Sequence, residues 1–284
     1  MNLSTFYRNF IRELQPIYSD HEAANITNMC FEKIAGVTKS DVIKNPDLIL
    51  TTDQFEELNN SLAELLIHKP VQYVLGEAWF YKLKFKVDKN VLIPRPETEE
   101  MVNEVFDFIK QSSSQKIIDI GTGSGCIPIS IKKEFAETLV TAIDVDEKAI
   151  SIAKENASIH QTEINFVQIN FLDTSNWNQF ETFDIIISNP PYIPIAEKAT
   201  MDKNVTTYEP HLALFVPNEQ PLLFYEAIAL FSKTHLTENG KIFMEVHENL
   251  AKEVAALFIN HQFHTEIKKD IFEKDRMVMA TRCR

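Results

Sequence analysis

The sequence predicts an α/β fold in which a mostly parallel sheet carries helices on both faces, preceded by a small helical bundle and a β-hairpin. Beyond residue 97, short apolar runs of strand length alternate with stretches of helical periodicity, which is typical of a parallel sheet covered by helices. Before residue 76, apolar side chains recur only at helical spacing and glycine is almost absent. We therefore expect a helical bundle at residues 1–75, a connecting hairpin at 76–96 and an α/β domain at 97–284.

Composition and charge exclude several classes of protein. Of the 284 residues, 44% are hydrophobic and 24% are charged, which is typical of a globular chain and not of a disordered one. The 28 basic and 41 acidic side chains give a formal net charge of −13, which disfavours a surface that binds the phosphates of bare DNA or RNA. The sequence has no apolar run of about eighteen residues, and residues 1–12 lack the apolar core of a secretory signal. Three widely spaced cysteines fit a reducing compartment, so we expect a cytoplasmic protein.

Two runs of apolar residues predict the helices of the bundle. The first run comprises Phe6, Phe10, Ile11 and Leu14, and the second comprises Phe55, Leu58, Leu62, Leu65 and Leu66. Thr52 and Asp53 stand where the N-terminal cap of the second helix is expected.

The segment 76–96 alternates apolar and basic side chains with the period of a half-exposed strand. Phe80, Leu83, Phe85 and Val87 alternate with Lys82, Lys84 and Lys86. Residues 88–90 predict a turn and residues 91–93 a returning strand. With five basic and two acidic side chains the segment has a net charge of +3. Residues 1–75 and 97–284 have net charges of −4 and −12, so the hairpin is the only basic segment of the three.

From residue 97 the expected elements follow one another in a βα order. Pro96 with the acids after it predicts a helix start, because proline suits the first helical position and acids suit the first turn. Four further helices are expected. One runs from the glycine loop to residue 135, one spans 147–159, one begins at about residue 222, and the last ends at residue 260. Strands are expected at 116–120, 139–143, 164–169, 183–188, 241–246, 263–269 and 276–281.

The distribution of glycine points to a ligand-binding loop. The chain has only six glycines, and three of them are Gly121, Gly123 and Gly125, in a loop that joins the first strand to a helix. A dinucleotide fingerprint would have glycine where this chain has Cys126. Asp144 ends the second strand, where a carboxylate can accept hydrogen bonds from ribose hydroxyls. The loop and the acid predict a ligand that contains adenosine, either a nicotinamide cofactor or S-adenosylmethionine.

The segment Asn189-Pro190-Pro191-Tyr192 favours S-adenosylmethionine. It follows a buried apolar strand whose end lies at the same edge of the sheet as the glycine loop. The nitrogen of a planar amide or aromatic amine is a weak nucleophile, and two acceptors, the Asn189 side-chain oxygen and the Pro190 carbonyl, can hold its NH2 group in line with an activated methyl. The prolines fix φ and thereby orient that carbonyl, and Tyr192 can pack on the planar group.

These motifs resemble those of the class I S-adenosylmethionine-dependent methyltransferases that modify planar NH2 groups. The stretch Val91-Leu92-Ile93-Pro94-Arg95-Pro96-Glu97-Thr98-Glu99 narrows the resemblance to the HemK/PrmC type, the N5-glutamine methyltransferases of class-1 peptide chain release factors. The resemblance spans nearly the whole chain. It implies a Rossmann-like, seven-stranded, mostly parallel sheet, and it implies that the substrate is the glutamine of a Gly-Gly-Gln motif in a release factor.

The resemblance also implies roles for individual residues. The methionine part of the cofactor would lie along Gly121, Thr122, Gly123, Ser124 and Gly125, the ribose against Asp144, and the adenine near Asn170 and Phe171. The substrate amide would be held by Asn189, Pro190 and Pro191 with Tyr192 beside it, and Asn189 would also contact the cofactor. Apart from the resemblance, a glutamine offers too few atoms for selection by the Asn-Pro-Pro-Tyr segment alone, so we expect the helical domain at residues 1–75 and the hairpin to dock the protein substrate.

Two features depart from the family pattern. Lys82 stands where the family commonly has glycine in the hairpin, and residues 215–221 replace a glycine-rich turn that usually follows Tyr208-Glu209-Pro210. Both leave open how the protein substrate is bound.

Other functions fit the motifs less well. A nucleic-acid amino methyltransferase of the adenine-N6 type would use the same Asn-Pro-Pro-Tyr chemistry, but it needs a basic face. A cofactor-binding protein without catalytic activity would not need Asn189. His261 and His264 are three residues apart with no third ligand nearby, so we expect no metal site, and we expect a monomer.

Overall fold

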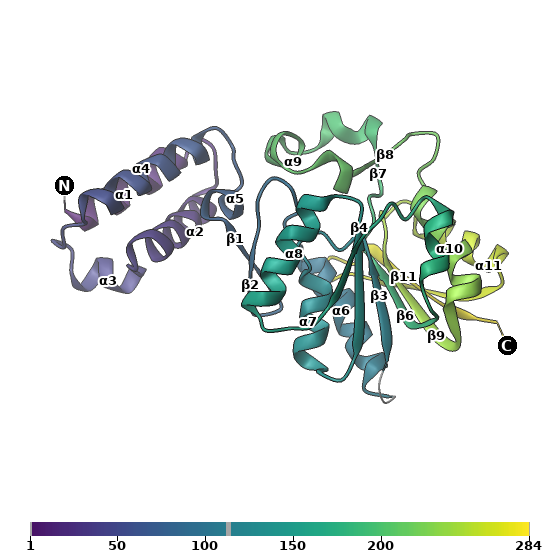
Figure 1. Ribbon diagram of the computed structural model, residues 1–284. Helices are drawn as coiled ribbons and strands as arrows, with labels where there is room; N and C mark the ends of the chain where they lie inside the picture. The colour runs from purple at the N-terminus through teal and green to yellow at the C-terminus, as the bar shows by residue number, and fades with distance from the viewer. Residues whose placement is uncertain (1, 112–114, 284) are drawn as a thin grey trace. The chain divides into compact units, whose positions relative to one another are not determined.

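The computed structural model describes residues 2–111 and 115–283 (Figure 1). Its internal contacts divide the chain into two compact units. The helical unit comprises Met1–Glu77 together with Asp202–Tyr208, and the sheet unit comprises Ala78–Met201 together with Glu209–Arg284. No helix within the described ranges is long and apolar enough to cross a membrane.

The helical unit contains the bundle that the apolar spacing predicts. Its helices are α1 (Leu3–Leu14), α2 (Asp20–Cys30), α3 (Lys39–Lys44), α4 (Thr52–Leu66), α5 (Val71–Leu75) and α9 (Lys203–Tyr208), with a π-helical turn at Phe31–Ala35. Phe6, Phe10 and Phe31 meet edge to face or tilted in its core. The cap of α4 is Thr51, which forms a reciprocal capping box with Gln54, so the predicted cap at residues 52 and 53 is one position late.

The hairpin turns earlier than the sequence predicts. Its strands are β1 (Glu77–Phe80) and β2 (Leu83–Lys86), and the two residues between them, Tyr81 and Lys82, have φ of 51° and 64°. Two left-handed residues in a two-residue loop match the twist of the flanking strands. The predicted turn at 88–90 does form, through an Asn90 amide that donates to the Asp88 carboxylate at 2.8 Å. However, residues 91–93 are not a strand, so the predicted returning strand is wrong.

The sheet unit is built on the predicted seven-stranded sheet, with the strand order β10-β11-β9-β6-β3-β4-β5. Strands β5, β4, β3, β6 and β9 are mutually parallel, whereas β11 and β10 run antiparallel to their neighbours. The bounds are β3 (Lys116–Ile120), β4 (Leu139–Asp144), β5 (Asn165–Gln168), β6 (Phe183–Ser188), β9 (Leu236–Glu245), β10 (Phe263–Lys269) and β11 (Asp275–Arg282). Strand β9 begins five residues before the predicted start at 241.

Helices cover both faces of this sheet (Figure 1). They are α6 (Pro96–Ile109), α7 (Cys126–Glu134), α8 (Glu147–Ile159), α10 (Leu223–His235) and α11 (Ala251–Asn260). Adjacent residues of a strand point to opposite faces, so Ile117 packs in the cluster with α6 and α7 while Ile118 packs in the cluster with α10 and α11. Besides this sheet and the β1-β2 hairpin, a further two-stranded sheet of β7 (Ile193–Pro194) and β8 (Phe215–Val216) was not predicted.

The order of the strands determines where a ligand can bind. The chain leaves β3 toward β4 and β5 and then returns to place β6 on the other side of β3. Ligands of open α/β sheets bind outside the carboxyl ends of the strands at such a reversal. The glycine loop follows β3, Asp144 ends β4 and Asn189 follows β6, so the fold brings these three predicted residues to one edge.

We expect Lys82→Gly to stabilise the hairpin. Lys82 has a φ of 64°, a conformation that strains a side chain with a Cβ but not glycine. The free energy of unfolding should rise by up to about 1 kcal/mol, as measured by denaturant titration. Lys84→Gly, in the extended backbone of β2, is the matched control and should lower it by roughly 0.5–1 kcal/mol. Equal losses in both variants would contradict a strained turn.

Candidate active site

A cavity of about 320 Å³ opens at the carboxyl ends of β3, β4 and β6, entirely within the sheet unit. Ten of the twelve predicted site residues line it: Gly121, Thr122, Gly123, Ser124, Asp144, Asn170, Phe171, Asn189, Pro190 and Pro191. The other two, Gly125 and Tyr192, are not among its lining residues. The cavity therefore joins the loop expected to bind the cofactor to the segment expected to bind an amide.

The glycine loop is held by the end of the neighbouring strand. The amides of Gly121 and Thr122 both donate to the Ile143 carbonyl at 2.9 Å, and the Gly123 amide donates to Asp144 Oδ2 at 2.9 Å. Gly121 and Gly123 have φ of 79° and 54°, and a Cβ on either would point into open space. Both therefore expose bare backbone to the cavity.

Gly125 has a different part in the loop. A Cβ at this position would lie 3.1 Å from the Cβ of Ala153 in α8 and from the Cδ1 of Ile129 in α7. Its glycine thus allows close helix packing behind the cavity, in addition to a φ of 79°.

Asp144 uses both carboxylate oxygens within the protein. Oδ2 accepts from the Gly123 amide, and Oδ1 accepts from the Asp146 amide at 3.0 Å. Burial raises the pKa of Asp144, and these backbone donors act in the opposite direction. A carboxylate can accept about four hydrogen bonds, so Asp144 can hold the glycine loop and still accept from ribose hydroxyls in the cavity.

Two buried polar groups lack a well-formed hydrogen bond at this loop. They are the carboxylate of Asp119, next to the end of β3, and the hydroxyl of Thr122, which lines the cavity. The pKa of Asp119 is raised from 3.8 to about 7, mainly by burial. The Thr122 hydroxyl acts against this rise, and the nearby charge of Asp144 adds to it. Unsatisfied buried groups are rare in native proteins. Of these two, the Thr122 hydroxyl belongs to the cavity lining, so it marks a place where a polar ligand fits.

The residues after β5 form the apolar side of the cavity. Phe171 is buried and packs against the rings of Trp177 and Phe231. Asn170 accepts from the Leu172 amide at 3.1 Å, which closes a tight turn around it. A backbone loop with open space, a carboxylate and the lining residues Ile169–Leu172 together fit S-adenosylmethionine, which carries an amino acid, a ribose and an adenine.

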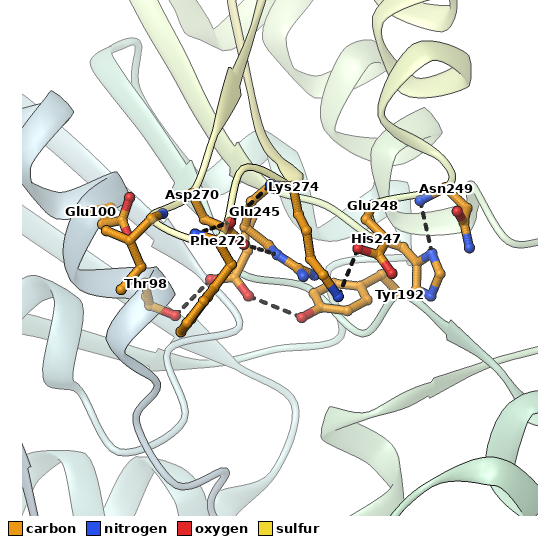
Figure 2. Close-up of polar contacts among 12 residues, drawn as sticks. Thr98, Glu100, Tyr192, Glu245, His247, Glu248, Asn249, Asp270, Phe272 and Lys274 are labelled. Atoms are coloured by element: carbon orange, nitrogen blue, oxygen red, sulfur yellow. Dashed lines mark hydrogen bonds and ion pairs between the residues drawn. The ribbon is translucent and has the colours of Figure 1, made fainter.

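The Asn189 side chain is fixed by a chain of hydrogen bonds. Its Nδ2 donates to Thr98 Oγ1 at 3.1 Å, and Thr98 Oγ1 donates to Glu245 Oε2 at 2.6 Å. The Tyr192 hydroxyl donates to the other oxygen of Glu245 at 3.0 Å (Figure 2). Since its NH2 group contacts Thr98, Asn189 keeps its amide oxygen as an acceptor.

The structure places Tyr192 away from the cavity lining. Its hydroxyl is bonded to Glu245, and its ring packs against the core and meets His247 edge to face at 6.2 Å between centroids. Burial raises the pKa of Tyr192 well above its ordinary value. That its ring packs on the substrate stays a prediction.

Sequence reasoning missed several residues of this site. Thr98 was included only in the stretch that carries the family resemblance and was given no role. Glu245 was not singled out, although an acid that ends the apolar run Ile242-Phe243-Met244 was a signal. Arg95 also lines the cavity and forms an ion pair with the buried Glu209. Within residues 2–111 and 115–283, no group of three or more His, Cys, Asp or Glu side chains is placed to hold a metal ion.

Comparisons with known proteins match both units. Residues 6–76 match the PrmC N-terminal domain, and residues 103–207 match the methyltransferase small domain. The release factor glutamine methyltransferase of Flavobacterium psychrophilum is 41% identical over 282 residues, which cover 98% of each chain. The protein of the same name from Bacteroides thetaiotaomicron is 36% identical over 284 residues, or 99% of this chain and 100% of that one. The crystal structure of a methyltransferase from Pyrococcus furiosus shares the fold, with a TM-score of 0.50 and 18% identity over 78% of this chain and 98% of that one.

We expect Asp119→Asn to change the pH dependence of stability. The pKa of Asp119 is raised from 3.8 to about 7, so the folded state keeps a proton that the unfolded state releases between these values. Stability from this group is therefore lost as pH rises from 3.8 to about 7. The asparagine variant has no such proton, so its free energy of unfolding should exceed that of the wild type by roughly 2–4 kcal/mol above this window.

Denaturant titrations without cofactor, at one pH below and one above this window, measure the difference. The same difference at both pH values would mean that Asp119 ionises normally.

Proposed function

This chain belongs to the release factor glutamine methyltransferase family, and we propose that it transfers a methyl group from S-adenosyl-L-methionine to the side-chain amide nitrogen of a glutamine. The proposed glutamine is that of the Gly-Gly-Gln motif in class-1 peptide chain release factors. The observation that carries the proposal is that Asn189 and Pro190 line the same cavity as the glycine loop and Asp144. An acceptor pair for an NH2 group thus lies beside a cofactor cradle.

The cavity residues divide into two sets in this proposal. Gly121 to Ser124 would hold the methionine part of the cofactor, Asp144 the ribose, and Asn170 and Phe171 the adenine. The bound cofactor supplies a methyl group activated by a positively charged sulfur.

The substrate side works by orientation and charge stabilisation. The Asn189 side-chain oxygen and the Pro190 carbonyl each accept one N–H of the glutamine amide, so the nitrogen presents its lone pair to the methyl group. Both acceptors also stabilise the positive charge that develops on the nitrogen during methylation. The methylated nitrogen then loses a proton readily, so this mechanism needs no general base.

The alternative of a nucleic-acid amino methyltransferase is not favoured. The curated relatives are named release factor glutamine methyltransferases, and the net charge of −13 disfavours phosphate binding. Acting on release factors would place the enzyme in the cytoplasm. That it acts as a monomer remains a prediction, which light scattering would check.

We also propose that the helical unit docks the release factor, with the hairpin steering its approach. A glutamine side chain alone offers too few atoms for selection, so specificity requires a wider surface. The helical unit carries large exposed apolar side chains, with Ile43 and Ile49 at 72% and 80% exposure. In the hairpin the side chains of Lys82, Lys84 and Lys86 are all exposed and can steer a partner. Lys86 also pairs with Glu155, and the Lys84 ammonium lies 5.1 Å from the centre of the Trp79 ring.

We expect Asn189→Ala and Asp144→Ala to have opposite effects. Without its acceptor Asn189→Ala should lower the rate of methyl transfer about a hundredfold or more, with near-normal affinity for S-adenosylmethionine. Asp144→Ala removes a carboxylate acceptor and the clamp on Gly123, so cofactor affinity should fall by roughly 1–3 kcal/mol with the maximal rate nearly retained.

Calorimetry measures the affinity, and mass spectrometry of the release factor measures the added methyl group. Unchanged turnover in Asn189→Ala would refute the mechanism, and unchanged affinity in Asp144→Ala would refute the ribose assignment.

Charge reversal in the hairpin tests the steering role. Lys82→Glu with Lys84→Glu should slow association with the release factor at low salt, and the difference from the wild type should shrink as salt screens it. Stopped-flow measurements at two ionic strengths give the rates. The control is Lys89→Glu, a basic residue outside both strands. An association rate that is unchanged at low salt would leave the hairpin without a role in steering.

A further inference from the structure

A series of hydrogen bonds that the proposed mechanism does not itself require reaches two residues of the cavity lining, Thr98 and Asn189. It runs from Glu245 at the end of β9, through Thr98 in the first turn of α6, to Asn189 after β6. We propose that Thr98 and Glu245 are positioning residues. They determine whether the oxygen or the NH2 group of the Asn189 side-chain amide points toward the substrate. This inference rests on the proposed function, because it concerns the acceptor for the glutamine amide.

The argument starts from the two-fold ambiguity of an asparagine side chain. The oxygen and the NH2 group of an amide occupy nearly the same volume, so packing alone does not distinguish the two orientations. Only the orientation with the oxygen toward the substrate accepts its N–H, because the reverse would set two donors against each other. A neighbour that accepts but cannot donate would select the productive orientation.

Thr98 is that neighbour, because Glu245 engages its only proton. The Thr98 hydroxyl donates to Glu245 Oε2 at 2.6 Å, so toward Asn189 it can only accept. Nδ2 of Asn189 lies 3.1 Å away and supplies the donor. The direction of the first bond therefore determines the direction of the second.

Glu245 is placed to keep that direction. Glu245 is 2% exposed. Its Oε2 accepts a hydrogen bond from the Thr98 hydroxyl, and its Oε1 accepts one from the Tyr192 hydroxyl (Figure 2). A carboxylate with two hydroxyl donors is an acceptor for both. Thr98 is itself 3% exposed, so water cannot readily replace either group.

The test compares Thr98→Val, which removes the hydroxyl at the same volume, with Thr98→Ser, which keeps it. We expect Thr98→Val to lower kcat for release factor methylation about 10- to 100-fold, with cofactor affinity within about twofold of the wild type. Thr98→Ser should retain most of the activity. In the Asn189→Ala background, Thr98→Val should cause no further loss, because both changes remove one function.

Losses that multiply in the double variant, or full activity in Thr98→Val, would overturn the inference. These outcomes differ from failure of the proposed function, in which the wild type itself adds no methyl to the release factor.

A second measurement, hydrogen exchange of the Asn189 side-chain NH2 group, depends neither on enzyme activity nor on whether Thr98→Val folds. In protein labelled with 15N at asparagine, the side-chain NH2 signal that disappears in Asn189→Asp identifies Asn189. We expect one of its protons to exchange slowly with solvent in the wild type and quickly in Glu245→Gln, whose own amide can reverse the Thr98 bond. Fast exchange in the wild type would overturn the inference.

Discussion

The buried carboxylate of Glu245 is the contact on which the substrate side of the cavity depends. Through two hydroxyl donors it joins the first turn of α6 and the loop after β6 to the end of β9. Thr98 and Glu245 are 147 residues apart in the chain, so this contact exists only in the folded sheet unit. Removing a donor from a buried charge costs more than losing a neutral hydrogen bond, because the charge is left uncompensated.

The cofactor side is built in the same way by Asp144. In the order β9-β6-β3-β4, the two carboxylates end the strands that flank the central pair. Asp144 on β4 holds the Gly123 amide in the loop after β3, and Glu245 on β9 fixes Asn189 after β6 through Thr98. Each acid orients the loop that follows its neighbouring strand. The two loops that would meet the cofactor and the amide are thus held by different acids, from opposite sides of the central strands.

Local sequence patterns were enough to predict the sheet, the bundle and most of the cavity. The strands are buried apolar runs, and motifs at their carboxyl ends converge because parallel strands end at one edge. The patterns failed where contacts are not local. The hairpin turn depends on Tyr81 and Lys82 adopting a left-handed backbone, which non-glycine residues seldom do and composition does not signal. Glu245 became recognisable only once the fold had placed it beside Thr98.

The helical unit also depends on a contact between segments that are distant in the chain, which local sequence patterns do not reveal. This contact determines how docking should be tested. Residues Asp202–Tyr208 belong to this unit, and the Tyr208 hydroxyl donates to the Ile67 carbonyl at 2.7 Å. In the chain, this segment lies between two groups of residues that line the cavity: Asn189, Pro190 and Pro191 before it, and Pro210, Leu212 and Ala213 after it. Deleting the N-terminal helices would therefore remove the partner of Tyr208 along with any docking surface. A loss of activity on deletion would have two explanations, whereas substitutions of exposed side chains such as Ile43 and Ile49 change only the surface.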